Sequence, residues 1–104
     1  MIDLQKLTKR IIDFRNKRHW VQEEAIAPKN MAIGLMLEAT ELLEVFVWTK
    51  DNRLPHDRKK HFEEELMDVL YWVLLIAHDQ KIDIPKAFER KMKKNEVKYP
   101  VKKK

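Results

Sequence analysis

The sequence contains no cysteine and no serine, and it contains a single glycine among 104 residues. The absence of cysteine fits a reducing compartment, so we predict a cytoplasmic protein without disulfides. The absence of both cysteine and serine gives little support to nucleophilic catalysis. One glycine cannot form a glycine-rich loop around phosphates, which excludes a P-loop or Rossmann-type nucleotide site.

Long hydrophobic runs are also missing. The longest uncharged apolar run, residues 69–77, is far shorter than the roughly 20 residues that a membrane span needs. The first residues, MIDLQKLTKR, are amphipathic and charged, unlike a signal peptide. We therefore expect no membrane span and no secretory signal.

Composition predicts one domain, residues 1–104. Hydrophobic residues make up 44% of the chain, which supports a real core, but that core is small for a monomer, so we predict a homo-oligomer. The net charge of +5 comes from 22 Lys and Arg against 17 Asp and Glu. The excess lies late in the chain and predicts a basic, flexible tail over residues 98–104.

Hydrophobic periodicity predicts four helices and an all-α, four-helix-bundle-type fold. The expected ranges are residues 3–18, 30–49, 58–78 and 83–95, with a loop over residues 20–29 and a polar connection over residues 51–57. Asn30 is the predicted N-cap of the second helix. Asp83 and Pro85 form a start signal for the fourth. Gly34 lies inside the second helix, where a missing side chain allows close helix packing.

Two pairs of acids carry the functional signal. Glu38 and Glu41 are three residues apart, as are Glu65 and Asp68, and both pairs are embedded in strongly apolar sequence. Residues three apart share one face of a helix. A short connection makes the two helices antiparallel neighbours, so four carboxylates should face one another. Oxygen-only ligands suit Mg²⁺, with Mn²⁺ as a substitute.

Other interpretations of these acids remain open. They could be solvated or paired with ordinary cations. A di-iron site normally needs Glu-x-x-His on two helices, and no Glu of this chain has His at that spacing. The Lys-rich C-terminal segment favours a binding module for nucleic acid or a protein partner, and the dense apolar helices favour a structural oligomerisation bundle. Neither alternative explains the acids within apolar helices.

Several segments, in order, resemble one known family. They are FRNKRHW, P-K-N at residues 28–30, LEATELLEVFVW, EEELMDVLYWVLLIA and IDIPKAFERKMKKNEVKYP. Together they resemble the MazG-like nucleotide pyrophosphohydrolases, in the all-α NTP pyrophosphatase group that includes the dCTP pyrophosphatases. The resemblance spans most of the chain.

The resemblance implies Mg²⁺-dependent hydrolysis of a (d)NTP to the monophosphate and pyrophosphate, with house-cleaning of non-canonical nucleotides as a role. It implies that the metal-binding and catalytic acids are Glu38, Glu41, Glu65 and Asp68. It implies that the substrate-binding residues are Trp20, Lys29, Asn30, Trp72, Asn95, Lys98 and Tyr99. It also implies homodimers or homotetramers with sites between subunits, and no stable nucleic-acid partner.

Two departures from the family pattern are visible. Leu37 precedes Glu38 where relatives often carry a second Glu, and the acid spacing survives this change. The loop VQEEAIAPKN carries two acids where relatives often have an aromatic residue and a His before P-K-N. This loop is expected to contribute to the base pocket, so the base preference stays open.

Overall fold

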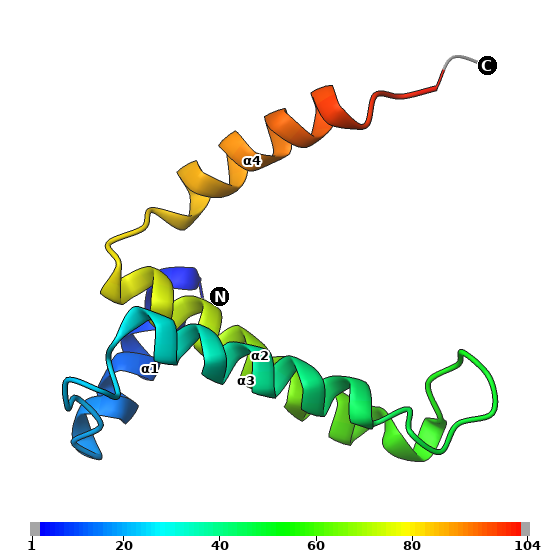
Figure 1. Ribbon diagram of the computed structural model, residues 1–104, viewed down its shortest axis with the longest axis horizontal. Helices are drawn as coiled ribbons and strands as arrows, with labels where there is room; N and C mark the ends of the chain where they lie inside the picture. Colours follow the sequence, from blue (N-terminus) through cyan, green and yellow to red (C-terminus); the bar gives the residue numbers. More distant parts are fainter. Residues whose placement is uncertain (1–2, 103–104) are drawn as a thin grey trace.

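The computed structural model describes residues 3–102, and these residues form four α-helices, one short 3-10 helix and no strand (Figure 1). The helices are α1 (Leu4–Lys17), α2 (Pro28–Glu44), η1 (His56–Arg58), α3 (Lys59–Asp79) and α4 (Ile84–Lys98). The predicted all-α class is therefore confirmed. The prediction of one domain over residues 1–104 stays a prediction.

Helix α1 begins and ends close to the predicted positions. The side chain of Asp3 accepts a hydrogen bond from the backbone N–H of Lys6 at 2.9 Å, which caps the helix. Arg15 and Lys17 lie in the last turn, where positive charge interacts favourably with the helix dipole.

The prediction for the ends of α2 was wrong at both sides. Ala27 is the N-cap, and Asn30 lies inside the first turn, where its side chain donates to the carbonyl of Glu24 at 2.9 Å. The proline at position 28 starts the helix because its missing N–H needs no partner there. At the other end, residues 45–48 turn away from the α-helix through hydrogen bonds between residues three apart.

The body of the molecule is the antiparallel pair α2 and α3, with α1 packed across α3 (Figure 1). The buried apolar side chains are Met31, Val45, Leu74, Leu75 and Ala77. Near the connection between the two helices, the rings of Phe46 and Phe62 meet edge to face at 5.8 Å. The core is therefore a narrow seam between two helices.

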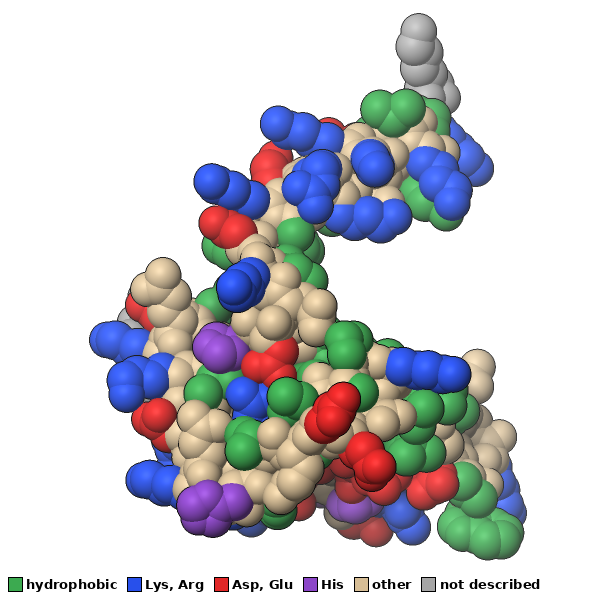
Figure 2. Space-filling model, turned by 60° about the vertical axis from the view of Figure 1, so that its left-hand side comes forward, with side chains coloured by type: hydrophobic (Ala, Val, Ile, Leu, Met, Phe, Trp, Pro, Cys, Tyr) green, Lys and Arg blue, Asp and Glu red, His purple; other side chains and the backbone are tan. Residues whose placement is uncertain are grey.

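Helix α4 projects away from this body (Figure 1). Asp83 caps it by accepting from the backbone N–H of Lys86 at 3.1 Å, and the helix continues to Lys98, past the predicted end near Asn95. Figure 2 shows Lys and Arg side chains along this arm. Of the predicted basic tail, Lys98 belongs to the helix, and residues 103–104 lie outside the described residues.

None of the helices within residues 3–102 has both the length and the apolarity to cross a membrane.

Candidate metal and nucleotide site

Three acids from two facing helices converge on one point. Glu38 of α2 and Glu65 and Asp68 of α3 each offer a carboxylate oxygen, and these oxygens lie within 4.8 Å of one another. The spacing of three residues puts Glu65 and Asp68 on one face of α3. The antiparallel packing of α2 brings Glu38 to that face. Such a group of carboxylates could hold a divalent cation.

Glu41 lies beside this group without belonging to the three. Its hydrogen bonds and its charge contribute to raising the pKa values of Glu38 and Glu65. The structure therefore brings the four predicted acids into one region, with three of them in a tight cluster.

The cluster concentrates negative charge. Burial, followed by the hydrogen bond and charge of Glu41 and the charges of the other acids, raises the pKa of Glu38 to about 7. Burial and Glu41 also raise the pKa of Glu65, against a lowering influence from His61 at 3.8 Å. Among residues 3–102, the buried Oε2 atoms of Glu38 and Glu65 have no hydrogen-bond partner. Unpaired buried oxygens of this kind are costly, and a cation would satisfy them.

A pocket of about 550 Å³ opens beside the cluster. Glu38 and Asp68 form part of its wall. The other residues that line it are Phe14, Arg15, Trp20, Ala25, Asn30, Tyr71, Trp72 and Leu75. One pocket therefore joins two acids of the cluster to a largely apolar, aromatic surface.

The aromatic side chains of this pocket form a continuous edge-to-face series. Trp20 meets Phe14 at 5.9 Å, Phe14 meets Tyr71 at 6.1 Å, and Tyr71 meets Trp72 at 5.8 Å between ring centroids. Edge-to-face pairs at these distances are favourable. The series links α1 and the loop that follows it to α3, and it offers a flat apolar surface to a ligand.

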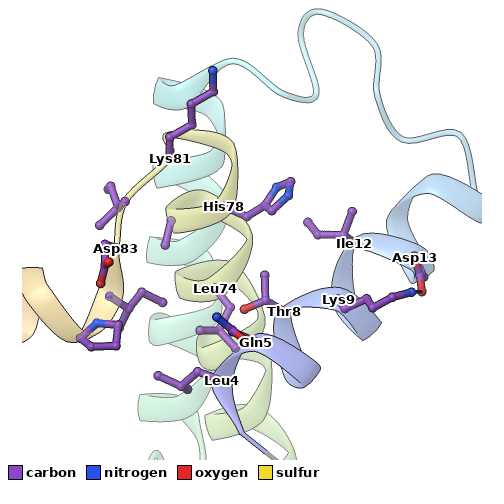
Figure 3. A pocket seen from close by; sticks show the side chains of 14 residues that line it. Leu4, Gln5, Thr8, Lys9, Ile12, Asp13, Leu74, His78, Lys81 and Asp83 are labelled. Carbon is purple, nitrogen blue, oxygen red and sulfur yellow. Dashed lines mark hydrogen bonds and ion pairs between the residues drawn. The ribbon is translucent and has the colours of Figure 1, made fainter.

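A second pocket, of about 640 Å³, lies between α1, the end of α3 and the start of α4 (Figure 3). Its lining includes Leu4, Ile12 and Leu74, with no Phe, Tyr or Trp. Its two carboxylates, Asp13 and Asp83, come from different elements and do not form a cluster with other acids of the described chain. We therefore assign the candidate site to the smaller pocket beside the acids.

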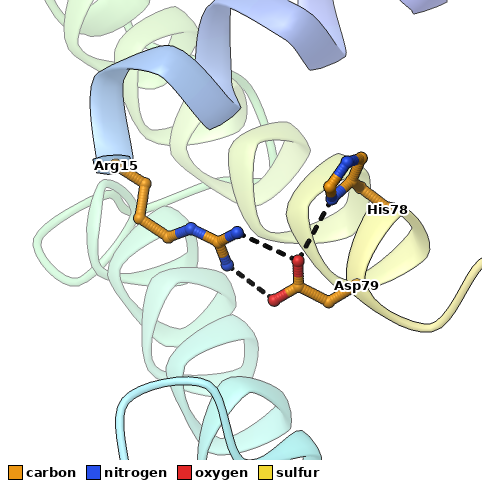
Figure 4. Close-up of polar contacts among 3 residues, drawn as sticks. All are labelled: Arg15, His78 and Asp79. Atoms are coloured by element: carbon orange, nitrogen blue, oxygen red, sulfur yellow. Dashed lines mark hydrogen bonds and ion pairs between the residues drawn. The ribbon is translucent and has the colours of Figure 1, made fainter. Parts of the chain in front are cut away.

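Arg15 is the main site residue that the sequence analysis missed. It is 8% exposed, lines the aromatic pocket and binds Asp79 through two hydrogen bonds of 2.6 and 3.1 Å (Figure 4). His78 contacts the same carboxylate at 3.1 Å. Arg15 follows Ile11 by four residues, so its place on the apolar face of α1 was a detectable signal.

The predicted substrate residues lie in three places. Trp20, Asn30 and Trp72 line the aromatic pocket. Lys29 is exposed at the start of α2. The remaining three lie at the far end of α4, away from the acids of the same chain (Figure 1): Asn95, Lys98 and Tyr99.

Comparison with known proteins places the chain among relatives of similar sequence. dCTP pyrophosphatase 1 of Mus musculus is 33% identical over 94 residues, which cover 86% of this chain and 54% of that protein. The corresponding protein of Homo sapiens is 33% identical over 94 residues, covering 85% of this chain and 54% of its own length. The chain thus spans about half the length of these mammalian relatives.

The fold has a similar counterpart among crystal structures. A pyrophosphatase from Archaeoglobus fulgidus superimposes with a TM-score of 0.86 and 35% sequence identity, covering 97% of this chain and 95% of that one. The sequence model of the MazG-like family matches residues 33–104, which contain all four predicted acids. The chain therefore belongs to the MazG-like family.

Proposed function

We propose that this protein is a metal-dependent nucleotide pyrophosphohydrolase that converts a (d)NTP to the monophosphate and pyrophosphate. The observation that carries the proposal is the convergence of Glu38, Glu65 and Asp68 at the wall of an aromatic pocket. The names of the mammalian relatives and of the archaeal structural neighbour agree with this chemistry.

The acids fit a divalent cation. The unpartnered Oε2 atoms of Glu38 and Glu65 are buried, and the donor set consists of carboxylate oxygens, which suits Mg²⁺ and allows Mn²⁺ as a substitute. Glu38, Glu65 and Asp68 would hold the ion, with Glu41 beside them. When bound, such an ion neutralises phosphate charge and lowers the pKa of water.

The aromatic series supplies the surface for the base. A nucleobase is flat, so Trp20 and Trp72 can stack on it while Phe14 and Tyr71 keep the pocket apolar. The amide nitrogen of Asn30 is held by the carbonyl of Glu24, which leaves the Oδ1 atom of Asn30 free to accept a hydrogen bond from a ligand.

The acids lie where the phosphates of a bound nucleotide would be. Glu38 and Asp68 belong to both the pocket wall and the acid cluster. A nucleotide whose base occupies the pocket can therefore place its phosphates next to the cluster. Glu41 contacts the cluster without being one of the three converging acids, and we assign it the role of orienting the attacking water.

We further propose that the functional unit is a homodimer or homotetramer. Large apolar side chains are exposed on the body and on α4; Leu43 is 69%, Met36 61% and Phe88 64% exposed. Met36 and Leu43 are seven residues apart and therefore share one face of α2, and contiguous exposed apolar faces usually mark interfaces. In an oligomer, α4 could bring Asn95, Lys98 and Tyr99 to the acids of a partner copy. A stable folded monomer in light scattering at micromolar concentration would refute this.

The test of the activity is pyrophosphate release by metal-stripped protein, with and without Mg²⁺, on a panel of canonical and modified nucleoside triphosphates. We expect release only with the metal. The panel also reports whether modified nucleotides are preferred, as a house-cleaning role requires. Retention of nucleic acid without any hydrolysis would favour the binding module instead.

A matched pair of variants assigns the activity to the acids. Glu41→Gln keeps the side-chain size but removes one negative charge, and we expect it to abolish release while leaving the helical content in circular dichroism intact. Glu63→Gln makes the same change at an exposed acid of α3 and should keep activity. Near-native activity of Glu41→Gln on every nucleotide cleaved by the parent protein would show that the cluster is not the catalytic centre.

A further inference from the structure

The single glycine of the chain lies inside a helix, where the backbone does not need glycine. Gly34 is in the interior of α2 and does not have a positive φ. Glycine in a helix interior is destabilising relative to alanine because it loses more conformational freedom on folding. The backbone conformation therefore does not explain this residue.

The neighbouring helix provides the explanation. A Cβ atom on Gly34 would lie 2.7 Å from Cη2, 2.8 Å from Cζ2 and 3.0 Å from Cζ3 of Trp72. All three are atoms of the six-membered ring of the indole. Favourable contacts between carbon atoms lie at about 3.5–4.0 Å. Any side chain larger than hydrogen at position 34 would therefore displace the indole of Trp72.

Trp72 has limited room to move because it is part of the site. It lines the aromatic pocket and meets Tyr71 edge to face, with 84° between the ring planes. A displaced indole would have to break the contact with Tyr71 or enter the pocket. Either change alters the surface that faces the base.

The contact is also one helical turn from the acids. Glu38 follows Gly34 by four residues on α2, and Trp72 follows Asp68 by four residues on α3. Residues four apart are neighbours on one helix face. Because the helices are antiparallel, Gly34 faces Trp72 in one turn and Glu38 faces Asp68 in the next. The indole is therefore placed at a set distance from the acid cluster.

We propose that Gly34 is a positioning residue that seats the indole of Trp72 against the backbone of α2 and thereby determines which bases the pocket accepts. This inference rests on the proposed nucleotide pyrophosphohydrolase activity. Gly34 touches neither the phosphates nor the metal ligands in this role. It acts by holding the stacking surface at the position that matches the acids.

The first test is Gly34→Ala. A change of one methylene in a pocket alters discrimination by a factor of roughly 10 to 200, so we expect KM for the preferred nucleotide to rise about tenfold. The value of kcat should fall much less, because the acids remain in place. The order of preference among the bases should also change. Far-ultraviolet circular dichroism should stay constant while the near-ultraviolet aromatic signal changes.

The second test is a cycle with Trp72→Phe. Phenylalanine lacks the outer indole ring that would meet the new Cβ atom, so Gly34→Ala should have little effect on KM in the Trp72→Phe background. A structural role alone would lower stability in the parent background without changing base selection. Thr40→Ala, an exposed change on the same helix, serves as the control and should leave KM unchanged.

The outcomes separate the two proposals. If the parent protein releases no pyrophosphate from any nucleotide with Mg²⁺, the proposed function and this inference both fail. If the parent is active but Gly34→Ala keeps its KM and base preference, or if the two substitutions act additively, the inference alone is overturned. If Gly34→Ala alone does not fold, the double variant decides: recovery of the fold in Gly34→Ala/Trp72→Phe, with the base preference of Trp72→Phe, supports the inference, and failure to recover the fold refutes it.

Discussion

Helix α3 carries two acidic sites whose electrostatics are opposite. At its C-terminal end, Asp79 has a partner for each carboxylate oxygen, since Arg15 binds both and His78 contacts one. Burial acts to raise the pKa of Asp79, but the hydrogen bonds and charges of Arg15 and His78 outweigh it and lower the pKa. Toward the middle of the helix, Glu65 and Asp68 face Glu38, and no Lys or Arg pairs with them among residues 3–102; only the imidazole of His61 approaches Glu65, at 3.8 Å.

The difference separates a stabilising contact from a binding site. The charges of Arg15 and Asp79 compensate each other and both carboxylate oxygens of Asp79 have partners, although the buried Nε atom of Arg15 has none among the described residues. The cluster around Glu38 keeps excess negative charge, and only a proton or a bound cation can remove it. Similar residues on one helix therefore hold the fold together at one end and remain available for a ligand at the other.

The largest expected effect is on activity at the cluster. Asp68→Asn removes one charge from the proposed metal ligands at nearly constant size, and loss of a group beside a metal ligand already costs 10- to 100-fold, so we expect a loss of at least about 100-fold in kcat. Pyrophosphate release measures it, with Asp57→Asn, a change outside the cluster, as the control. Full activity of Asp68→Asn would show that the cluster is not a binding site and so does not differ in function from the ion pair at Asp79.

The corresponding change at the other site should affect stability first. Arg15→Met leaves the carboxylate of Asp79, whose side chain is 15% exposed, without its cation. Breaking a buried ion pair by removing one partner costs about 3 kcal/mol in free energy of unfolding. Urea denaturation measures this. The double variant Arg15→Met/Asp79→Leu should recover part of the lost free energy of unfolding. An unchanged stability of Arg15→Met would contradict the stabilising role of the ion pair.

The two sites should also respond to pH in opposite directions. The pKa of Glu38 is raised from 4.5 to about 7, so the folded chain keeps a proton that the unfolded chain loses, and stability should fall as pH rises through that range. The pKa of Asp79 is lowered from 3.8, so its contribution is present above that value and is lost as pH falls below it.

Thermal melts of metal-stripped protein from pH 3 to pH 8 test this comparison. Stability should be greatest under mildly acidic conditions. Glu38→Gln should flatten the fall toward neutral pH, and Asp79→Asn should flatten the fall in acid. A stability that rises steadily from pH 5 to pH 7 in the stripped parent protein would contradict the raised pKa of Glu38.

The smallest expected effect is the stabilisation by metal. A ligand that binds only the folded state at ten times its dissociation constant adds about 1.4 kcal/mol. Adding millimolar Mg²⁺ to stripped protein should therefore raise the melting temperature by a few degrees, and more at pH 8 than at pH 5, because protons compete for the same carboxylates. Glu65→Gln should reduce the shift and Arg15→Met should not, whereas an unchanged melting temperature of the parent protein would refute metal binding.

The sequence predicted the helices well where the signals were local. Asp83 caps the fourth helix as predicted, and the apolar rhythm located all four helices, with the largest error at the C-terminal end of α2. Asn30 shows where local signals fail. It was predicted as the N-cap, but its side-chain amide donates to the carbonyl of Glu24, and the helix already begins at Pro28. Several residues near a helix start can cap it, and the path of the preceding loop decides among them.

Local sequence patterns also could not predict which residues meet in the tertiary structure. The spacing of Glu65 and Asp68 determined that they share a face of α3. The bond between Arg15 and Asp79 joins residues 64 positions apart, so no local pattern could reveal it. The placement of α4, which carries Asn95, Lys98 and Tyr99 away from the acids of its own chain, was equally invisible in the sequence.

The sequence by itself determined the all-helical class, the two acidic pairs and the availability of aromatic residues for a flat ligand. Each of these follows from side-chain chemistry and from the period of a helix. Only the tertiary structure decided that Glu38 meets Asp68 while Gly34 meets Trp72. It also decided that Asp79 receives the guanidinium of Arg15, whereas the cluster has no Lys or Arg partner among the described residues. Such pairings depend on how two helices are aligned along each other, and that alignment is set by packing across the whole seam between them.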